Sequence, residues 1–314
     1  MNLRPFRFGL VATEAGSSAA WREKAQRAES VGYDILLVPD HIVGGRVGWA
    51  PALMAAAAAT SRLRIGTNVL DNDFRHPAFV AQDAATLDML TDGRFELGIG
   101  AGWLLADYTT TGIPWEAPGV RAGRMEEAVT IITQLLEGKT VTLHGQHYTI
   151  NELPPSVLPV QHPRVPLMIG AGGPRMLAFA ARHADIVSVV FTSRREGGLT
   201  LDFGTASVAA KIARVREAAG DRIDQIELNT LLQGVYSADE RDAAANDLSA
   251  ALETPAEAFF DSPYYLFGST DEIVETLQRR REELGISYYS VFDRHWETLN
   301  PVVERLAGDV VWDA

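Results

Sequence analysis

The stretch Gly172-Gly173-Pro174 is of a type that could bind an anion, because a short apolar run ends in two glycines and reopens as a helical pattern. The first backbone N–H groups of a helix have no partner within the helix, and the helix dipole directs its positive end toward the preceding loop. A phosphate could therefore be held there. The alternative is that the glycines only form a tight turn between a strand and a helix, and the motif alone leaves both possibilities open.

Asp40 and His41 form a second candidate group at the end of an apolar run. A carboxylate beside an imidazole at the tip of a strand can relay protons. The structural alternative is that Asp40 caps the following turn and that His41 packs locally. The residue types do not decide between these two hypotheses.

Glycines alternate in the segment GIGAGW, which runs from Gly98 to Trp103. This spacing leaves room for a large, flat molecule to approach the backbone, and Trp103 would supply an aromatic wall. Alternatively, the glycines relieve crowding in the sheet. We favour a binding function, because a loop tryptophan without a ligand would be costly. Thr67 and Asn68 either contact the same ligand or follow the ordinary alternation of faces along a strand.

Several other classes of site are excluded or unsupported. The chain has no cysteine, which excludes disulfides, thiolate metal sites and cysteine nucleophiles. Its seven histidines show neither HxH nor HExxH spacing, so we predict no metal site and expect His144 and His147 at the surface. The net charge of −13 and the lack of a basic run argue against a nucleic-acid partner. The first residues lack the apolar core of a signal peptide, and no apolar run is long enough to span a membrane, so we expect a cytoplasmic protein.

Short apolar runs alternate with helical patterns along the chain. The predicted strands are residues 6–12, 34–40, 63–70, 95–100, 166–170, 185–191, 225–236 and 286–293. The predicted helices are residues 18–31, 51–60, 77–90 and 124–136, one that starts at residue 174, and residues 205–219, 238–252, 270–284 and 301–307. Residues 141–165 interrupt the alternation with a polar hairpin-like piece, 141–150, and a proline-rich connector.

Eight strands, each followed by a helix, predict the α/β class and a closed (β/α)8 TIM barrel. An open doubly wound sheet would need a switch point and usually a GxGxxG turn after its first strand, where this chain has TEAGSSAA. We expect one domain over residues 1–314, with an insertion at 141–165, after the fourth strand, and another near the seventh strand. Chemistry in such barrels lies at the carboxyl ends of the strands, which is where the candidate residues fall.

Nearly the whole chain resembles the bacterial luciferase-like family of flavin and deazaflavin oxidoreductases. The strongest block lies between Ile65 and Trp103 and contains IGTNVL and RHPAFVAQDAATLDMLTDGRFELGIGAGW. The segment IGAGGPRMLAFAARHAD is a second signature, and DEIVETLQRRREELG is a weaker third. The GAGW segment and the strand end VPDH are most similar to the branch that uses coenzyme F420, an 8-hydroxy-5-deazaflavin.

This resemblance implies how such a cofactor would bind. Gly172 and Gly173 would offer backbone N–H groups to its phosphate, and Arg175 and Met176 would begin the helix whose dipole helps to hold it. A non-prolyl cis peptide bond between two residues would form a bulge behind the ring. The two residues of this bond are Asn68 and Val69. The other cofactor contacts that the resemblance implies are Asp40, Asp71, Gly100, Ala101 and Gly102.

The resemblance also implies hydride transfer at C5 of the deazaflavin, with His41 as the catalytic acid–base group. His41 matches a residue proposed as a proton donor or ring-orienting group in relatives that oxidise sugar phosphates. Those relatives have a glutamate directly after the glycines of the fourth strand, where this chain has Trp103, and a nearby tryptophan where it has Gly45. Ala106 lacks the amide of the family. We therefore do not expect glucose-6-phosphate oxidation, and we expect Trp103 to line the substrate pocket.

Two alternative functions stay open. One is an FMN-dependent monooxygenase that uses O2 and reduced flavin from a separate reductase, and the other is a flavin-binding protein without turnover. The substrate is an unidentified small molecule, and the resemblance implies a homodimer. Arg46, Arg75, Arg194 and Arg195 either meet the anionic tail of the cofactor or are plain surface arginines. The aromatic run 259–267 either lines the substrate pocket or, as we expect, packs under the last helices.

Overall fold

The structure is a computed structural model, and it describes residues 3–44, 46–194 and 200–307. These residues form two compact units. The N-terminal unit comprises Ala12–Arg27 and Ile35–Gly170. The C-terminal unit comprises the described parts of Met1–Val11, Ala28–Asp34 and Ala171–Ala314.

Parallel strands form the centre of the N-terminal unit. β2 pairs with β3, β3 pairs with β5, and β5 pairs with β8. The bounds are Ile35–Val38 for β2, Arg64–Thr67 for β3, Phe95–Gly100 for β5 and Leu167–Ala171 for β8. All residues of β2 and β5 are buried, which explains why the sequence of β2 is apolar on both faces rather than alternating. The one buried charge in β5, Glu96, is paired with Arg64 at 2.6 Å.

Helices follow the strands of this unit: α2 (Trp49–Ala57), α3 (Pro77–Leu90), α4 (Leu105–Thr111) and α5 (Pro118–Leu136). The start of α3 has two signals in the sequence, since Pro77 stands in its first turn and His76 accepts the N–H of Ala78 as a cap. The start of α5 likewise has Pro118 in its first turn. These local signals set where each helix leaves its loop, and so where the site residues on it lie.

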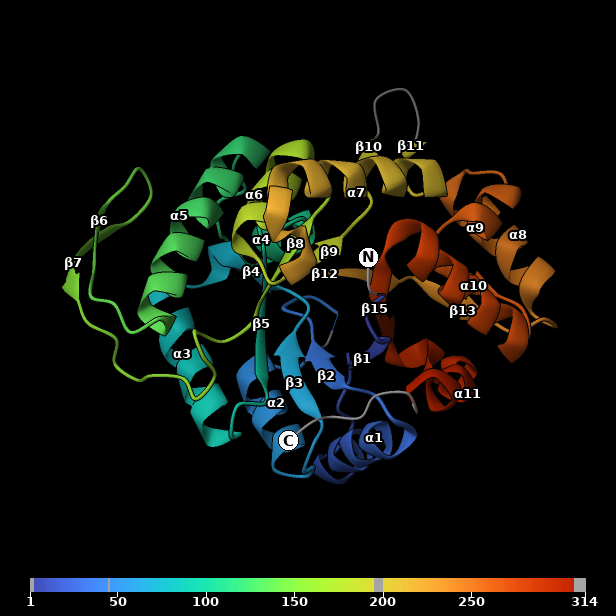
Figure 1. Ribbon diagram of the computed structural model, residues 1–314, viewed down its shortest axis with the longest axis horizontal. Coiled ribbons are helices and arrows are strands. Elements are labelled where there is room, and N and C mark those ends of the chain that lie inside the picture. Colours follow the sequence, from blue (N-terminus) through green and yellow to red (C-terminus); the bar gives the residue numbers. More distant parts are fainter. Residues whose placement is uncertain (1–2, 45, 195–199, 308–314) are drawn as a thin grey trace. The chain divides into compact units, whose positions relative to one another are not determined.

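The predicted hairpin is present as β6 (Val141–His144) and β7 (Thr149–Leu153), which pair antiparallel. Figure 1 shows it next to α5, at the edge of the N-terminal unit. The Glu127 carboxylate of α5 accepts the N–H groups of Gln146, His147 and Tyr148 at 2.7 to 3.1 Å. These bonds satisfy the turn and lower the pKa of Glu127, although its burial works in the opposite direction.

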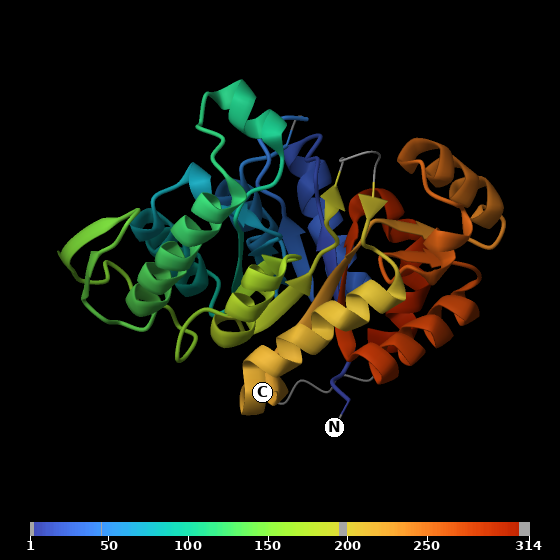
Figure 2. The same ribbon diagram turned by 90° about the horizontal axis from the view of Figure 1, so that it is seen from above.

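The C-terminal unit is built on the parallel strands β1 (Arg7–Val11), β15 (Ile286–Phe292), β12 (Glu227–Leu232) and β9 (Ile186–Val189), paired in that order. Its helices are α6 (Pro174–His183), α7 (Thr205–Ala219), α8 (Arg241–Leu252), α9 (Glu257–Asp261), α10 (Thr270–Leu284) and α11 (Trp296–Leu306). α6 and α7 lie side by side (Figures 1 and 2). A capping box between Ser269 and Glu272 starts α10.

The described chain contains eight parallel strands that alternate with helices, beginning with β1 and α1 (Ser18–Val31) and ending with β15 and α11. This is the (β/α)8 barrel of the α/β class, as predicted. Four predicted helices have the observed bounds, namely α1, α3, α7 and α10. None of the helices in the described part combines the length and the apolar character that a membrane span requires.

Two predicted strands are wrong in their extent. Residues 63–70 form β3 and a separate β4 (Leu70–Asp71), because a bulge at Asn68–Val69 interrupts the strand. In the predicted strand 225–236, Gln225 is the last residue of a 3-10 helix (Gly220–Gln225), and the residues after it form two separate strands, β12 and β13 (Gly234–Tyr236). β13 leaves the main sheet to pair with β14 (Tyr265–Phe267).

The aromatic run 259–267 mostly packs in the core, as expected. Phe259, Tyr264 and Tyr265 are buried, and Phe203 contacts the rings of Phe259 and Tyr265. Burial raises the pKa of Tyr265 to about 12.

The predicted helix start at residue 301 is wrong, since α11 begins at Trp296 and Pro301 lies inside it. Short α4 was not predicted at all, because its seven residues carry little helical periodicity.

Candidate active site

The bulge between β3 and β4 is built around a cis peptide bond between Asn68 and Val69, which confirms the predicted non-prolyl cis bond. The Asn68 N–H donates to Val38 O at 3.1 Å, so the bulge lies beside the end of β2. The Asn68 side-chain Nδ2 is buried and has no hydrogen-bond partner among the described residues. A buried amide donor without an acceptor is costly, which makes it a candidate to bind an acceptor atom of a ligand.

The space beside the glycines of β5 is filled by the bulge and is not open to a ligand. A Cβ on Gly98 would overlap Thr67 O, and a Cβ on Gly100 would lie 2.8 Å from Cγ2 of Val69. Gly170, near the end of β8, lies close to the same valine. A Cβ added to Gly170 would lie 3.5 Å from Cγ2 of Val69. Two of the alternating glycines therefore accommodate protein atoms, and the predicted contact between Gly100 and a cofactor stays a prediction.

Asp40 at the end of β2 is buried and bound on both oxygens. Oδ1 accepts Nη2 of Arg75 at 3.0 Å, and Oδ2 accepts both Nη1 of Arg75 and the N–H of Asp71 at 3.1 Å. The Asp71 N–H joins the end of β2 to β4, and the guanidinium of Arg75 joins it to the segment before α3. Asp40 and His41 therefore do not form a proton relay with each other, and Arg75 is an ion-pair partner rather than a plain surface arginine.

Asp71 and Tyr108 form a second polar pair above β5. The Tyr108 hydroxyl lies 2.9 Å from each carboxylate oxygen of Asp71 and 3.2 Å from Oδ2 of Asp73. Burial raises the pKa of Asp71 to about 6, although hydrogen bonds from the Asp73 N–H and from Tyr108 work against the shift. Gly102, with φ +75°, leaves the space that this pair occupies, because a Cβ there would overlap the Tyr108 hydroxyl.

Two arginines of α5, which the sequence analysis did not single out, bind segments next to these polar groups. The guanidinium of Arg121 is buried, donates to Ala101 O at 3.2 Å and to Gly102 O at 3.3 Å, and lies 3.6 Å from the centroid of the Trp115 ring. Arg124 pairs with Asp73 at 2.8 Å and also with Glu116. The backbone of Ala101 and Gly102, both predicted cofactor contacts, is thus held from behind by α5.

His41 is bound to a residue of α4. Its Nδ1 lies 2.7 Å from Oδ2 of Asp107, and the other oxygen of that carboxylate accepts the N–H groups of Ile42 and Val43, each at 2.9 Å. The rings of Trp103 and His41 form a T-shaped pair with centroids 5.6 Å apart, and Trp103 is 73% exposed. Asp107 is therefore a functional candidate that the sequence analysis missed, since no motif or spacing marked it.

The predicted phosphate loop lies in the C-terminal unit, between β8 and α6. Gly173 is the N-cap of α6, and within the described residues it provides no side-chain cap for the first N–H groups of this helix. A Cβ on Gly172 would lie 2.8 Å from Val190 O, whereas one on Gly173 would have nothing within 4 Å. Arg175 is exposed and Met176 half-buried in the first turn of α6. Val190 and Thr192 therefore pack against Gly172, whereas no described residue packs against Gly173 on its side-chain side.

An ion pair between a buried lysine and a half-buried aspartate fixes the segment behind Gly172. Lys211 on α7 lies 2.9 Å from Oδ1 of Asp202 and donates to Val190 O at 2.8 Å. The same aspartate accepts the Thr192 hydroxyl at 2.8 Å. Burial lowers the pKa of Lys211, and the Asp202 contact opposes that shift. This network positions Val190 and Thr192, against which Gly172 packs.

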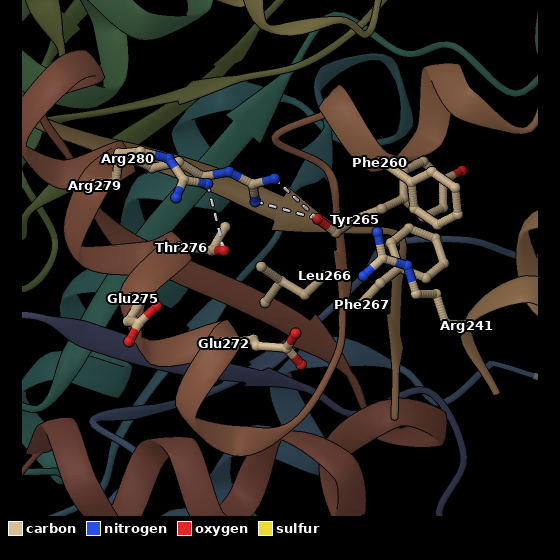
Figure 3. Close-up of a pocket in the computed structure, with 10 residues that line it drawn as sticks. All are labelled: Arg241, Phe260, Tyr265, Leu266, Phe267, Glu272, Glu275, Thr276, Arg279 and Arg280. Carbon is tan, nitrogen blue, oxygen red and sulfur yellow. Dashed lines mark hydrogen bonds between the residues drawn. The ribbon is translucent and has the colours of Figure 1, made fainter. Parts of the chain in front are cut away.

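A cavity of about 290 Å³ lies elsewhere in the C-terminal unit, beside α10 (Figure 3). Arg280 at its wall is buried and donates to the carbonyl groups of Ser262, Pro263 and Tyr265. Four residues of the aromatic run 259–267 line it, but none of the predicted catalytic or cofactor-binding residues does. Its lining residues are Arg241, Phe260, Tyr265, Leu266, Phe267, Glu272, Glu275, Thr276, Arg279 and Arg280.

Some residues named in the sequence analysis lie outside the described residues or at their margin. Arg195 and Gly45 lie outside the described residues, and Arg194 is placed only as part of the short strand β10 (Ser193–Arg194), which pairs with β11 (Thr200–Leu201).

Over residues 3–44, 46–194 and 200–307, no group of three or more histidine, aspartate or glutamate residues could hold a metal ion. His144 is exposed and His147 is half-buried in the hairpin.

Comparison with known proteins decides the family. The model of the luciferase-like monooxygenase family matches residues 4–285. This chain belongs to the luciferase-like monooxygenase family. The resemblance seen in the IGTNVL, GIGAGW and GAGGP segments is therefore confirmed at the level of the family.

Curated relatives and solved structures agree with this assignment. The chain is 32% identical over 282 residues to an F420-dependent glucose-6-phosphate dehydrogenase of Nakamurella multipartita, covering 86% of this chain and 80% of that protein. It is 32% identical over 231 residues to the enzyme of the same name from Amycolatopsis mediterranei, covering 71% and 67%.

Two solved structures show the same fold. An F420-dependent secondary alcohol dehydrogenase, solved in complex with an F420-acetone adduct, matches with a TM-score of 0.78 at 20% identity, covering 96% of this chain and 98% of that one. The coenzyme F420-dependent tetrahydromethanopterin reductase of Methanopyrus kandleri matches with a TM-score of 0.76 at 18% identity, covering 98% and 99%.

Proposed function

We propose that this luciferase-like protein is an oxidoreductase that uses coenzyme F420 and transfers a hydride between the cofactor and a small organic substrate. The observation that carries the proposal is the bulge at Asn68–Val69, where a buried amide donor has no partner among the described residues. The curated relatives are named as F420-dependent dehydrogenases, which supports the choice of cofactor.

The residues present fit this cofactor at two places. In the N-terminal unit, the unpartnered Nδ2 of Asn68 would donate to an acceptor atom of the ring, and Val69 would support one ring face. In the C-terminal unit, the N–H groups at the start of α6 would bind the phosphate, aided by the helix dipole and by the open space at Gly173. Asp40, Asp71, Gly100, Ala101 and Gly102 stay proposed contacts or supports of this site.

The catalytic residue that we propose is His41. When bound, the deazaflavin accepts or donates a hydride at C5, and the protein supplies position, electrostatics and exclusion of side reactions. His41 takes up the proton of the substrate when the substrate is oxidised and returns it in the reverse direction. Its side chain is 24% exposed, so a substrate can reach the ring.

Trp103 lines the substrate side in this proposal. It is largely exposed, and its ring makes a T-shaped contact with the His41 ring. Because a tryptophan stands where the sugar-phosphate-oxidising relatives have a catalytic glutamate, we propose that glucose 6-phosphate is not the substrate.

We also propose that the chain forms one domain, that two copies form a homodimer, that the protein is cytoplasmic, and that it has no nucleic-acid or membrane partner.

The test is a fluorescence titration of the apo-protein with oxidised F420 and, in parallel, with FMN. We expect micromolar or tighter binding of F420 and weak binding of FMN. The reverse preference would contradict the proposal and favour an FMN-dependent monooxygenase with a separate reductase, which oxygen consumption with reduced FMN would then check. Tight binding of F420 without hydride transfer to any tested alcohol or carbonyl compound would favour a flavin-binding protein without turnover.

A further inference from the structure

Asp107 is the one carboxylate that contacts His41 among the described residues, and its side chain is almost completely buried. We propose that Asp107 is a positioning residue: it holds the His41 proton on Nδ1 and leaves Nε2 as the atom that exchanges a proton with the substrate. This inference rests on the proposed function of His41 as the acid–base group.

The geometry restrains both the ring and the backbone of His41. Oδ2 of Asp107 lies 2.7 Å from Nδ1, while Oδ1 accepts the N–H groups of Ile42 and Val43, the two residues that follow. One carboxylate therefore fixes the loop after β2 and the orientation of the imidazole together. Trp103 packs edge-on against the ring and restricts its rotation further.

The charge of Asp107 decides which nitrogen carries the proton. Burial acts to raise the pKa of Asp107, but hydrogen bonds from Val43, His41 and Ile42 together lower it below its ordinary value. An ionised carboxylate can only accept hydrogen bonds, so Nδ1 of His41 must be the donor. In the neutral imidazole Nε2 is then an acceptor, and within the described part of the chain it has no hydrogen-bond partner.

This arrangement limits the class of substrate. In the oxidative direction a substrate C–H bond breaks, its electron pair and hydrogen pass as hydride to the oxidised cofactor, and the proton of the adjacent O–H or N–H group passes to Nε2 of His41. The resulting imidazolium is paired with Asp107. The substrate must therefore carry an exchangeable proton on the atom next to the reacting carbon, as an alcohol or an amine does, and its product is the carbonyl compound or imine.

Asp107→Asn tests the inference, because the amide preserves the shape and can still accept the Ile42 and Val43 N–H groups through its oxygen. Its NH2 group would then face Nδ1, which forces the proton onto Nε2. The matched control is Asp247→Asn, an exposed aspartate of α8 that undergoes the same change of charge. Long-range 1H–15N NMR of the His41 ring at alkaline pH reports the tautomer directly, without cofactor or substrate.

We expect the Nδ1–H tautomer in the unsubstituted protein and in Asp247→Asn, and the Nε2–H tautomer in Asp107→Asn. With an alcohol substrate, kcat should fall about 10²- to 10³-fold in Asp107→Asn with little change in KM. In a His41→Ala background, Asp107→Asn should cost nothing further, since it acts through the imidazole.

The outcomes separate the inference from the function on which it rests. The same tautomer with and without Asp107→Asn, or an additional loss of kcat in the His41→Ala background, would overturn the positioning role of Asp107. Unchanged hydride transfer in His41→Ala would instead overturn the catalytic role of His41, whatever tautomer is observed. Unfolding of Asp107→Asn, seen by circular dichroism, would leave the tautomer of the unsubstituted protein as the deciding measurement, and an Nε2–H tautomer there contradicts the inference.

Discussion

The loops after β2 and β5 and the loop before α6 present two different kinds of site. In the first, side chains bind one another: Asp40 with Arg75, Asp71 with Tyr108, and His41 with Asp107. In the second, the available donors are backbone N–H groups at a helix start without a side-chain cap. The first kind of site fixes the position of individual reacting atoms, whereas the second holds a charge through the backbone.

This difference predicts which substitutions matter. Where side chains form the site, removing one functional group changes chemistry. Where backbone N–H groups form the site, removing a side chain should change the affinity for the cofactor little. Adding atoms that displace the loop should weaken that affinity. The predictions that follow test this contrast from the largest expected effect to the smallest.

The largest effect is expected for His41→Ala, which removes the proposed acid–base group. Hydride transfer, measured by stopped-flow absorbance of the cofactor, should slow about 10²- to 10⁴-fold. The Kd for F420 should stay within about threefold, since no cofactor contact is removed. An unchanged rate would show that the imidazole takes no part in the chemistry.

Gly172→Ala should weaken F420 binding about 10- to 100-fold, because its Cβ would lie 2.8 Å from Val190 O and the loop must shift. Gly173→Ala is the matched control, since its Cβ meets nothing within 4 Å, and it should change the Kd by less than about fivefold. Fluorescence titration of both variants measures this. Equal effects at the two positions would contradict the view that the loop is backed by protein on one side only.

Asp71 should make stability depend on pH in the acidic range. Burial raises its folded pKa to about 6, above the ordinary aspartate value, so the folded state binds the proton more tightly than the unfolded state. This contribution to stability is fully present below about pH 4 and is lost as pH rises through about 6.

Urea unfolding of the unsubstituted protein and of Asp71→Asn measures this contribution. Relative to the variant, the unsubstituted protein should lose about 2 kcal/mol of unfolding free energy between about pH 4 and 7, allowing for partial exposure of the carboxyl group. A constant difference between the two proteins over this range would mean that the carboxyl group of Asp71 does not titrate there.

The smallest effect is expected for Arg175→Ala. This exposed side chain can add only a screened attraction to the anion at the start of α6. The Kd for F420 should rise about two- to fivefold in low salt, and the difference should shrink as salt is added. A loss well above tenfold would show that a side-chain charge, rather than the helix backbone, holds the anion.

Much of the fold could be predicted because its signals are local. The helices α1, α7 and α10 show apolar periodicity. Clear starts mark α3, at His76-Pro77, and α10, at the Ser269–Glu272 capping box. The bounds of β12 and β13 could not be predicted, because the pairing of β13 with the distant β14 decides where the strand leaves the sheet. Pairing between segments remote in sequence leaves no periodic trace in either segment.

The sequence by itself determined the (β/α)8 order of elements and the glycine loop before α6, since strand and helix patterns and paired glycines are local signals. The cis bond at Asn68–Val69 was predicted only from the resemblance to the family, because no local preference of these two residues favours it. Tertiary structure decided which polar groups meet. Asp107 lies 66 residues after His41, and only the arrangement of β2 and α4 brings its carboxylate to Nδ1. The same arrangement sends Asp40 to Arg75 instead of to its neighbour His41, because adjacent residues at a strand end point in different directions.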